Sequence, residues 1–296
     1  MPEISIILET NTGSLKGSLN LPLVSRKKPI VLIIAGSGPT DRDGNIGALL
    51  TKNNCLKMLA EALSAAGFPS VRYDKRGIGE SVKTAEADLR FESYVEDAAA
   101  WVNMLKNDVR FAGVVVLGHS EGSLIGMLAS RAESVCAFVS IAGPAERASS
   151  LLRQQLAGKL SAELEKRNEE ILCTLEMAEL AENIPLELDI FYRKSIQPYL
   201  ISWFKYIPAE EFSRLEIPTL LMQGDTDIQI DVDQALALQA ANTDAELVVI
   251  QGMNHVLKLV SSDYYQQQSS YGDPNLPIAP SLIENLTRFL GDRVKI

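Results

Sequence analysis

Ser120 lies at the centre of the sequence G-H-S-E-G at residues 118–122, which has the form G-x-S-x-G. An apolar run typical of a β-strand precedes it at residues 114–117, and a run typical of a helix follows it at residues 123–130. This setting is that of a nucleophile elbow, a sharp turn that exposes the serine hydroxyl. The pattern predicts Ser120 as a nucleophile; the alternative is a glycine-rich turn whose serine does no chemistry.

A serine nucleophile needs a base that takes its proton. The chain has two histidines, His119 and His255. His119 is the neighbour of Ser120, and at a sharp turn we expect its side chain to diverge from the serine hydroxyl. His255 follows the strand-like run 246–250 on a loop from which it can reach the elbow. His255 is therefore the predicted base, and the alternative is a loop histidine that faces solvent.

The base needs a carboxylate that orients the imidazole and stabilises its charged form. Asp225 and Asp227 both follow the strand-like run 217–223, so both are candidates. Asp231 and Asp233 open a predicted helix, where carboxylates cap exposed N–H groups. The acid is therefore expected directly after that strand.

Four further stretches carry a family resemblance. They read A-G-S-G-P-T-D-R-D-G-N at residues 35–45, Y-D-K-R-G-I-G-E-S at 73–81, Q-G-D-T-D at 223–227 and M-N-H-V-L-K at 253–258. With the elbow, they make the chain resemble the α/β-hydrolase superfamily over nearly its whole length. Within it, the chain resembles bacterial esterase-type serine hydrolases whose first loop reads H-G-S-G-P-x-D-R-D. Ala35 stands where most members carry the histidine, which supports the loop and performs no chemistry.

The resemblance assigns the acid. Asp227 fits the G-x-x-D pattern that follows this strand in many α/β-hydrolases, and Asp225 is expected to organise the turn. The implied triad is Ser120, Asp227 and His255, in the chain order of that fold.

The resemblance also implies an oxyanion hole, in which backbone N–H groups stabilise the negative charge that acyl transfer develops. One donor is the amide of Glu121, and the other, by its position in the first loop, is that of Ser37. In the same loop, Arg42 and Asp43 are expected to form an ion pair that braces the loop; the alternative is that they contact a substrate group.

Composition excludes several partners. The chain has 296 residues, of which 46% are hydrophobic and 22% charged, with a formal net charge of −10. Nucleic acids and anionic membranes require a positive face, so neither is an expected partner. No apolar run approaches the roughly 18 residues of a membrane span. The N-terminal residues do not resemble a signal peptide, so a cytoplasmic protein is expected, although a removed leader would leave no trace.

The three cysteines, Cys55, Cys136 and Cys173, are scattered and show no metal-ligand spacing. Free thiols suit a reducing cytoplasm. The sequence also lacks a phosphate-binding P-loop and a dinucleotide fingerprint. No metal and no cofactor are therefore expected.

Short apolar runs alternate with helical stretches, which predicts an α/β fold with a mostly parallel sheet and helices on both faces. An antiparallel hairpin is expected to open the chain. Its strands are 4–8 and 13–21, the later strands are 30–35, 70–73, 114–117, 136–142, 219–223 and 246–250, and the helices are 51–66, 91–106, 234–241 and 281–290. The stretch 261–277 is polar and proline-punctuated, and it is expected to be a loop.

Residues 144–214 interrupt the alternation because they carry helical periodicity and no strand pattern. Leucines recur every four residues from Leu152 to Leu164. The segment is predicted to be a helical cap inserted into a core of residues 1–143 and 215–296. Its second half is aromatic, and Tyr199, Trp203 and Phe204 are the candidates for lining a substrate pocket. The alternative is that the aromatic rings only pack the cap against the core.

Together these features predict a serine hydrolase that cleaves small-molecule carboxylic esters of small to medium acyl chains through an acyl-enzyme. Thioester cleavage, or amide cleavage at a chain end, is the alternative on the same triad. A ligand-binding protein of the same fold without catalysis is the alternative of another class. The oligomeric state is not predicted.

Overall fold

A mixed eight-stranded sheet forms the centre of the computed structural model, which describes residues 3–23, 27–47, 51–131 and 134–294. The strand order is β1-β2-β4-β3-β5-β6-β7-β8. β1 and β2 form an antiparallel hairpin, β2 pairs antiparallel with β4, and the strands from β4 to β8 run parallel. The strands are β1 (Glu3–Thr10), β2 (Gly13–Asn20), β3 (Ile30–Ile34), β4 (Ser70–Tyr73), β5 (Val114–His119), β6 (Val135–Ile141), β7 (Thr219–Gly224) and β8 (Glu246–Ile250).

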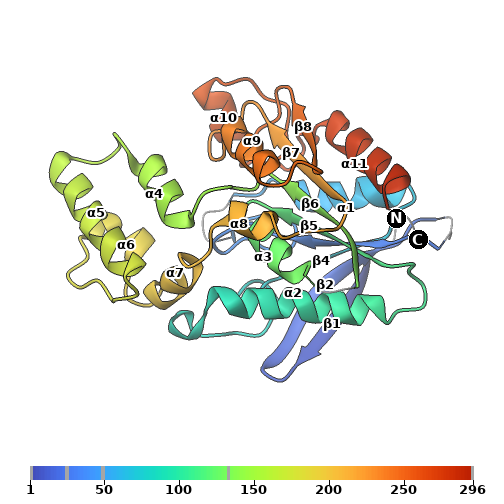
Figure 1. Cartoon of the computed structure of the whole chain (residues 1–296), viewed down its shortest axis with the longest axis horizontal. Helices are drawn as coiled ribbons and strands as arrows, with labels where there is room; N and C mark the ends of the chain where they lie inside the picture. Colours follow the sequence, from blue (N-terminus) through green and yellow to red (C-terminus); the bar gives the residue numbers. More distant parts are fainter. Residues whose placement is uncertain (1–2, 24–26, 48–50, 132–133, 295–296) are drawn as a thin grey trace.

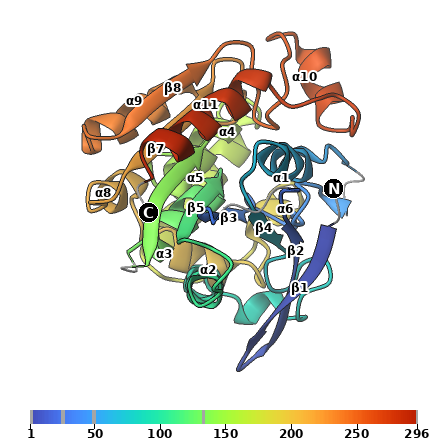
Figure 2. The same ribbon diagram turned by 90° about the vertical axis from the view of Figure 1, so that its right-hand side faces the viewer.

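Helices cover both faces of this sheet, as Figures 1 and 2 show. The helices of the sheet region are α1 (Cys55–Ala65), α2 (Phe91–Lys106), α3 (Glu121–Ala129), α9 (Val232–Ala241), α10 (Tyr264–Ser270) and α11 (Pro280–Asp292), with a short 3₁₀ turn η2 (Glu86–Asp88). The helices of the stretch between β6 and β7 are α4 (Ala148–Leu156), α5 (Ala162–Glu176), α6 (Leu186–Tyr192), α7 (Gln197–Trp203) and α8 (Pro208–Phe212).

Side chains alternate along the central strands and so build two separate cores. In β3, Val31 and Ile33 pack into the core that holds α1 and α11, whereas Leu32 and Ile34 pack into the core that holds α2 and α3. Full burial of such a side chain contributes about 1.5–3 kcal/mol, so an apolar run in a central strand is fixed from both faces. This explains why the predicted α/β fold with helices on both faces is confirmed.

The predicted strands match the observed ones to within two residues at each end, and the predicted helix at residues 91–106 coincides with α2. The prediction for residues 51–66 was wrong at its start, because α1 begins at Cys55. Thr51 forms a β-bridge with Ile46, and Asn54 has a left-handed backbone with φ of 53°. The chain therefore turns before it becomes helical.

The prediction of a loop at residues 261–277 was also incomplete, since α10 lies within it. Asp263 caps this helix by accepting a hydrogen bond from the N–H of Gln266 at 3.0 Å. A short polar helix with a capping aspartate lacks the apolar period that identifies longer helices, but the capping residue itself is a readable signal.

Helices α4 to α7 lie together at one side of the sheet (Figure 1). Residues 142–218 are all described and contain no strand of the sheet. The leucine period from Leu152 to Leu164 does not form one helix, because α4 ends at Leu156 and Gly158 takes a positive φ of 68° before α5 begins. Among the residues that the structure describes, every helix is too short or too polar to cross a lipid bilayer.

Candidate active site

Ser120 occupies the turn between β5 and α3. Its backbone has φ of 54° and ψ of −122°, a combination that residues other than glycine rarely adopt. Its N–H donates to the carbonyl of Ile141 at 3.0 Å, which ties the turn to β6. The strain and the hydrogen bond together hold the side chain at the end of the strand, as a nucleophile elbow requires.

The glycines of the pattern are there because the turn is crowded. A Cβ atom on Gly118 would lie 2.1 Å from the carbonyl oxygen of Gly122. A Cβ atom on Gly122 would lie 2.4 Å from the carbonyl oxygen of Ile34. Both contacts are far below van der Waals distance, so these two positions accept only glycine.

Asp227 and His255 form a buried pair. His255 Nδ1 lies 2.8 Å from Asp227 Oδ2, and the side chains are 7% and 1% exposed. Asp227 Oδ1 accepts the N–H groups of Gln229 and Ile230 at 2.8 and 3.0 Å, and Gln223 Nε2 lies 3.3 Å from Oδ2. Burial by itself raises the pKa of the Asp227 carboxyl, but His255 and these N–H groups outweigh it and hold that pKa below its usual value. The carboxylate is therefore ionised and fixed.

Of the two candidate aspartates, Asp227 is the one that contacts His255. Asp225 is exposed and accepts the N–H of Gly252 at 2.6 Å, which joins the loop after β7 to the loop after β8. Asp231 caps α9, as predicted, by accepting the N–H of Gln234 at 3.1 Å. Each aspartate thus has a different structural partner.

The side chain of His119 contacts the His255 loop, and it also lines the cavity that Ser120 and His255 line. Its Nε2 lies 2.8 Å from the carbonyl oxygen of His255, and the two imidazole rings are 4.9 Å apart. A carbonyl oxygen only accepts, so Nε2 carries the proton and donates. Burial, and then the neighbouring His255, lower the pKa of His119 to about 4. His119 is therefore a neutral donor that holds the backbone of the predicted base, a role that the sequence did not indicate.

Ser120 and His255 line the same small cavity of about 90 Å³. Ser37 and Gly36 of the first loop line it as well, and so does Tyr271. The predicted nucleophile, the predicted base and one predicted oxyanion donor are thus brought together from three separate parts of the chain.

The first loop is braced, but not in the predicted way. Arg42 and Asp43 do not pair with each other: Arg42 forms ion pairs with Asp74, at 3.7 Å, and with Glu80, whereas Asp43 accepts from Arg72 Nε at 2.8 Å. The expected ion pair was therefore wrong, because adjacent side chains on this loop point to different partners.

A buried ion pair lies beside the elbow. Glu121, which follows Ser120, is 2% exposed, and its Oε2 lies 2.9 Å from Lys75 Nζ. The hydroxyl of Tyr199 in α7 donates to the other carboxylate oxygen, Oε1. Burial, and then the neighbouring Glu121, raise the pKa of Tyr199 far above its usual value, so the hydroxyl keeps its proton. The sequence did not single out Lys75.

A second cavity of about 410 Å³ opens between the first loop, Glu121 and α7. Tyr199 and Trp203 line it, together with Ser37, which also lines the smaller cavity. Phe204, the third predicted pocket residue, is 2% exposed and packs into the hydrophobic core. The wall is mostly apolar, and its other lining residues include Pro39, Ile78, Leu89, Tyr94, Ile190, Ile196 and Leu200.

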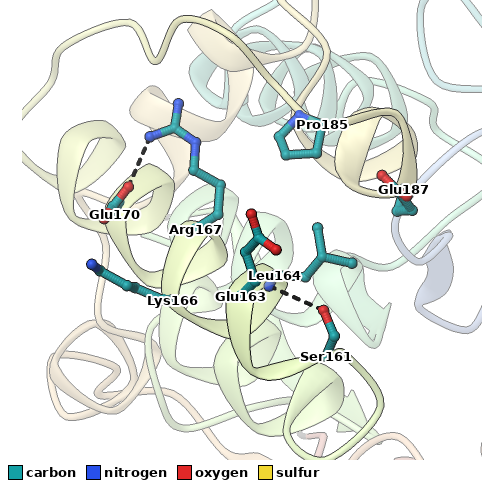
Figure 3. Close-up of a pocket in the computed structure, with 8 residues that line it drawn as sticks. All are labelled: Ser161, Glu163, Leu164, Lys166, Arg167, Glu170, Pro185 and Glu187. Carbon is teal, nitrogen blue, oxygen red and sulfur yellow. Dashed lines mark hydrogen bonds and ion pairs between the residues drawn. The ribbon is translucent and has the colours of Figure 1, made fainter.

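A third cavity, of about 580 Å³, lies on α5 and the start of α6 (Figure 3). Its lining is charged, and Arg167 pairs with Glu170 at 3.0 Å within it. All its lining residues fall between positions 161 and 187, whereas Ser120 and His255 line a different cavity. Within the described part of the chain, no three His, Cys, Asp or Glu side chains are arranged to hold a metal ion.

Part of the chain matches a known protein family, and most of the chain matches one relative. Residues 51–181 match the family described as serine aminopeptidase, S33. The chain is 30% identical over 252 residues to the esterase EstD of Thermotoga maritima. The matched residues make up 84% of this chain and 59% of that protein. The chain thus spans about three fifths of the length of this curated relative.

Solved structures resemble nearly the whole chain. Est1E from Butyrivibrio proteoclasticus, with ferulic acid bound, has a TM-score of 0.67 at 18% identity and covers 98% of this chain and 99% of its own. The α/β-hydrolase GrgF from Penicillium sp. sh18 has a TM-score of 0.66 at 16% identity and covers 99% of both chains. With the mixed sheet and its two helical layers, these likenesses show that the chain has the α/β-hydrolase fold.

Proposed function

We propose that the chain hydrolyses small-molecule carboxylic esters through a covalent acyl-enzyme, with Ser120 as nucleophile, His255 as general base and acid, and Asp227 as the carboxylate that orients His255. The observation that carries the proposal is the 2.8 Å contact between Asp227 Oδ2 and Nδ1 of His255, a residue that lines the same cavity as Ser120. A hydrogen bond at Nδ1 leaves Nε2 of the same ring available to the serine hydroxyl.

The reaction has two halves. In the first, His255 Nε2 takes the proton of Ser120 as Oγ attacks the ester carbonyl, and the same proton then passes to the alcohol as it leaves. In the second half, water gives one proton to His255 and attacks the acyl carbonyl; the acyl–Oγ bond then breaks, His255 returns the proton to Ser120 Oγ, and the carboxylic acid leaves. Asp227 remains ionised throughout and stabilises the imidazolium that forms in each half.

The backbone N–H groups of Ser37 and Glu121 are proposed as the oxyanion donors. Ser37 lines the cavity that contains Ser120, and Glu121 is the first residue of α3, where N–H groups are free of helical partners. Loss of one such donor slows acyl transfer by about 10²–10³.

The two cavities suggest which part of the ester lies where. The leaving alcohol must receive its proton from His255, so it belongs on the side of the small cavity that His255 lines. The acyl group then extends into the 410 Å³ cavity under α7, whose apolar wall suits acyl chains of small to medium length. Tyr199 and Trp203 are the proposed acyl-contacting residues, and Phe204 supports α7 from the core.

This arrangement motivates a domain proposal: a core of residues 1–143 and 215–296, and a cap of residues 144–214. The core range includes the short stretches outside the described residues. Several contacts join the two segments: the N–H of Phe91 donates to Ser202 Oγ at 2.7 Å, Arg193 pairs with Glu86, and Arg131 pairs with Glu211. The 410 Å³ cavity lies between α7 of the proposed cap and the first loop of the proposed core, as expected for a cap that covers a catalytic centre.

Amide cleavage at a peptide end is the second candidate, favoured by the match to the serine aminopeptidase description over residues 51–181. A free substrate amine requires an available carboxylate. The two acidic residues that line the 410 Å³ cavity are already paired, Glu86 with Arg193 and Glu121 with Lys75. The ester is therefore the preferred substrate, and amino-acyl anilides and acyl thioesters are the comparison substrates.

The test is the Ser120→Ala variant, assayed with a p-nitrophenyl ester beside the wild type. We expect turnover to fall by at least 10³-fold, to the residual level that binding alone supports, while the circular dichroism spectrum is retained. Undiminished turnover would reject the serine mechanism. Absence of turnover in the wild type on esters, thioesters and anilides would favour the non-catalytic ligand-binding alternative.

A further inference from the structure

Lys75 is a buried cation next to the first loop. Its side chain is 1% exposed, and it lies two residues beyond the end of β4. Its Nζ donates to the carbonyl oxygen of Gly36 at 2.6 Å and to Glu121 Oε2 at 2.9 Å, and it lies 4.9 Å from the ring centroid of Tyr94. Burial of an ammonium is costly unless such partners compensate it, so these contacts fix the ammonium at one point.

The contact with Gly36 constrains the N–H of Ser37. The carbonyl of Gly36 and the N–H of Ser37 belong to one planar trans peptide, in which the C=O and N–H bonds point in opposite directions. When Lys75 holds the carbonyl oxygen on one side, the N–H of Ser37 must point to the other. Ser37 is the proposed oxyanion donor of the first loop, and it lines the cavity of Ser120.

The contact with Glu121 links the same ammonium to the second proposed donor. Glu121 begins α3, and its backbone N–H comes directly after the nucleophile. Its carboxylate is held by Lys75 on one oxygen and by the Tyr199 hydroxyl on the other. The first loop, the start of α3 and the helix α7 thus meet at one carboxylate–ammonium pair, whose charges cancel.

We propose that Lys75 is a positioning residue of the oxyanion hole: it orients the Gly36–Ser37 peptide and the start of α3 so that both N–H groups point to the developing oxyanion. This inference rests on the proposed function. A hydrogen bond from an ammonium to the carbonyl also polarises the peptide and makes its N–H a stronger donor. Lys75 itself does not touch the substrate oxygen.

The loss of Lys75 is expected to weaken binding of the transition state, and kinetics can distinguish this from a purely structural role. A residue that orients oxyanion donors lowers kcat when it is lost and leaves KM nearly unchanged, because the ester carbonyl uses these donors weakly in the ground state. A residue that only supports the fold lowers stability and the active fraction without such a split.

The experiment compares two neutralised ion pairs. Lys75→Met alone leaves the Glu121 carboxylate buried without a cation and is expected to cost stability, so the informative variant is the double change Lys75→Met/Glu121→Gln. The matched control is Arg76→Met/Asp97→Asn. It removes a slightly less buried pair at the next residue, whose side chains are 11% and 3% exposed against 1% and 2% for Lys75 and Glu121. In this pair Arg76 Nε lies 2.8 Å from Asp97 Oδ2, outside the proposed site.

With a p-nitrophenyl ester, we expect the Lys75/Glu121 variant to lose about 10–100-fold in kcat, part of the 10²–10³ that removal of a whole donor costs, with KM within about threefold. Its inhibition constant for a trifluoromethyl ketone, which forms an oxyanion on the serine, should rise by the same factor. The Arg76/Asp97 control should keep the wild-type kcat per folded molecule. A crystal structure of the Lys75/Glu121 variant should show the Gly36–Ser37 peptide rotated or mobile.

The outcomes are distinguishable. A Lys75/Glu121 variant with wild-type kcat, or with an unmoved Gly36–Ser37 peptide, overturns the role of Lys75 and leaves the proposed function intact. An equal loss of kcat in the control also overturns it, because the loss would then reflect general destabilisation. A wild-type enzyme without Ser120-dependent turnover overturns the proposed function and this role together.

Discussion

Replacement of Asp227 by asparagine changes one oxygen to an NH₂ group and should change the tautomer of His255. Asp227 Oδ1 accepts two backbone N–H groups, from Gln229 and Ile230, so the asparagine carbonyl must take that side. Its NH₂ group then faces His255 Nδ1 in place of Oδ2. An NH₂ group only donates, so it favours the imidazole with its proton on Nε2. That ring cannot accept the proton of Ser120.

The size of the effect follows from this tautomer. A carboxylate-to-amide change in a triad with intact geometry lowers kcat by about 10⁴, which corresponds to about 5 kcal/mol in the activation barrier. The new NH₂ group also faces Gln223 Nε2, which lies 3.3 Å from Oδ2, so a hydrogen bond becomes a donor–donor contact. We expect the free energy of unfolding to fall by about 1–3 kcal/mol. The loss of rate is therefore much larger than the loss of stability.

The assay is kcat/KM for a p-nitrophenyl ester at pH 8, with urea unfolding on the same preparations. Asp225→Asn is the matched control, because it makes the same chemical change two residues away on a side chain that contacts Gly252 and not His255. Its kcat/KM should stay within about threefold of the wild type. An Asp227→Asn enzyme within tenfold of the wild type, or an equal loss in Asp225→Asn, would refute the tautomer argument.

Two further predictions concern the neighbouring residues. Burial lowers the pKa of His119 to about 4, against 6.5 in the unfolded chain. As the pH falls, the imidazole is therefore protonated in the unfolded chain first, and the stability that is present above pH 6.5 is lost toward pH 4. Between pH 8 and pH 5.5, the free energy of unfolding should fall by about 1.4 kcal/mol more in the wild type than in His119→Gln, as measured by urea unfolding. Equal losses in the two proteins would contradict the low pKa of His119. Trp203→Ala should enlarge the 410 Å³ cavity and raise the kcat/KM ratio of decanoate to butanoate esters by about tenfold. Room for about two more buried methylenes, at about 0.8 kcal/mol each, corresponds to roughly that factor. An unchanged ratio would place the acyl chain elsewhere.

The fold was predictable because its central strands, such as β3, β5 and β7, are apolar runs that the sheet buries on both faces. Runs such as 30–34 and 114–117 have no other stable position, so their order and the intervening helices indicated the parallel sheet. The apolar pattern did not predict the helix bounds correctly where polar contacts determine the backbone conformation. Asn54 turns the chain before α1, and Asp263 caps a helix that has no apolar period.

The candidate site was predictable only where a motif carries local geometry. Gly118 is required by a backbone contact within the turn itself, and Gly122 by its close approach to the backbone at the end of β3. Both glycines stand in the five-residue pattern, so the elbow can be recognised from the sequence. Lys75 meets a partner 46 positions away, and Tyr199 reaches Glu121 across 78 positions. Nothing in the local pattern of either residue indicates such a partner, since only the packed fold brings them together.

The most direct test of the account is labelling of the wild-type protein with a fluorophosphonate, followed by mass spectrometry of its peptides. A fluorophosphonate reacts with a serine that an adjacent base activates, and we expect one modified residue, Ser120. The modification should be lost in His255→Ala, which keeps the serine and removes the proposed base. Labelling at another residue, or equal labelling of Ser120 in the His255→Ala variant, would contradict the claim that these two side chains act together.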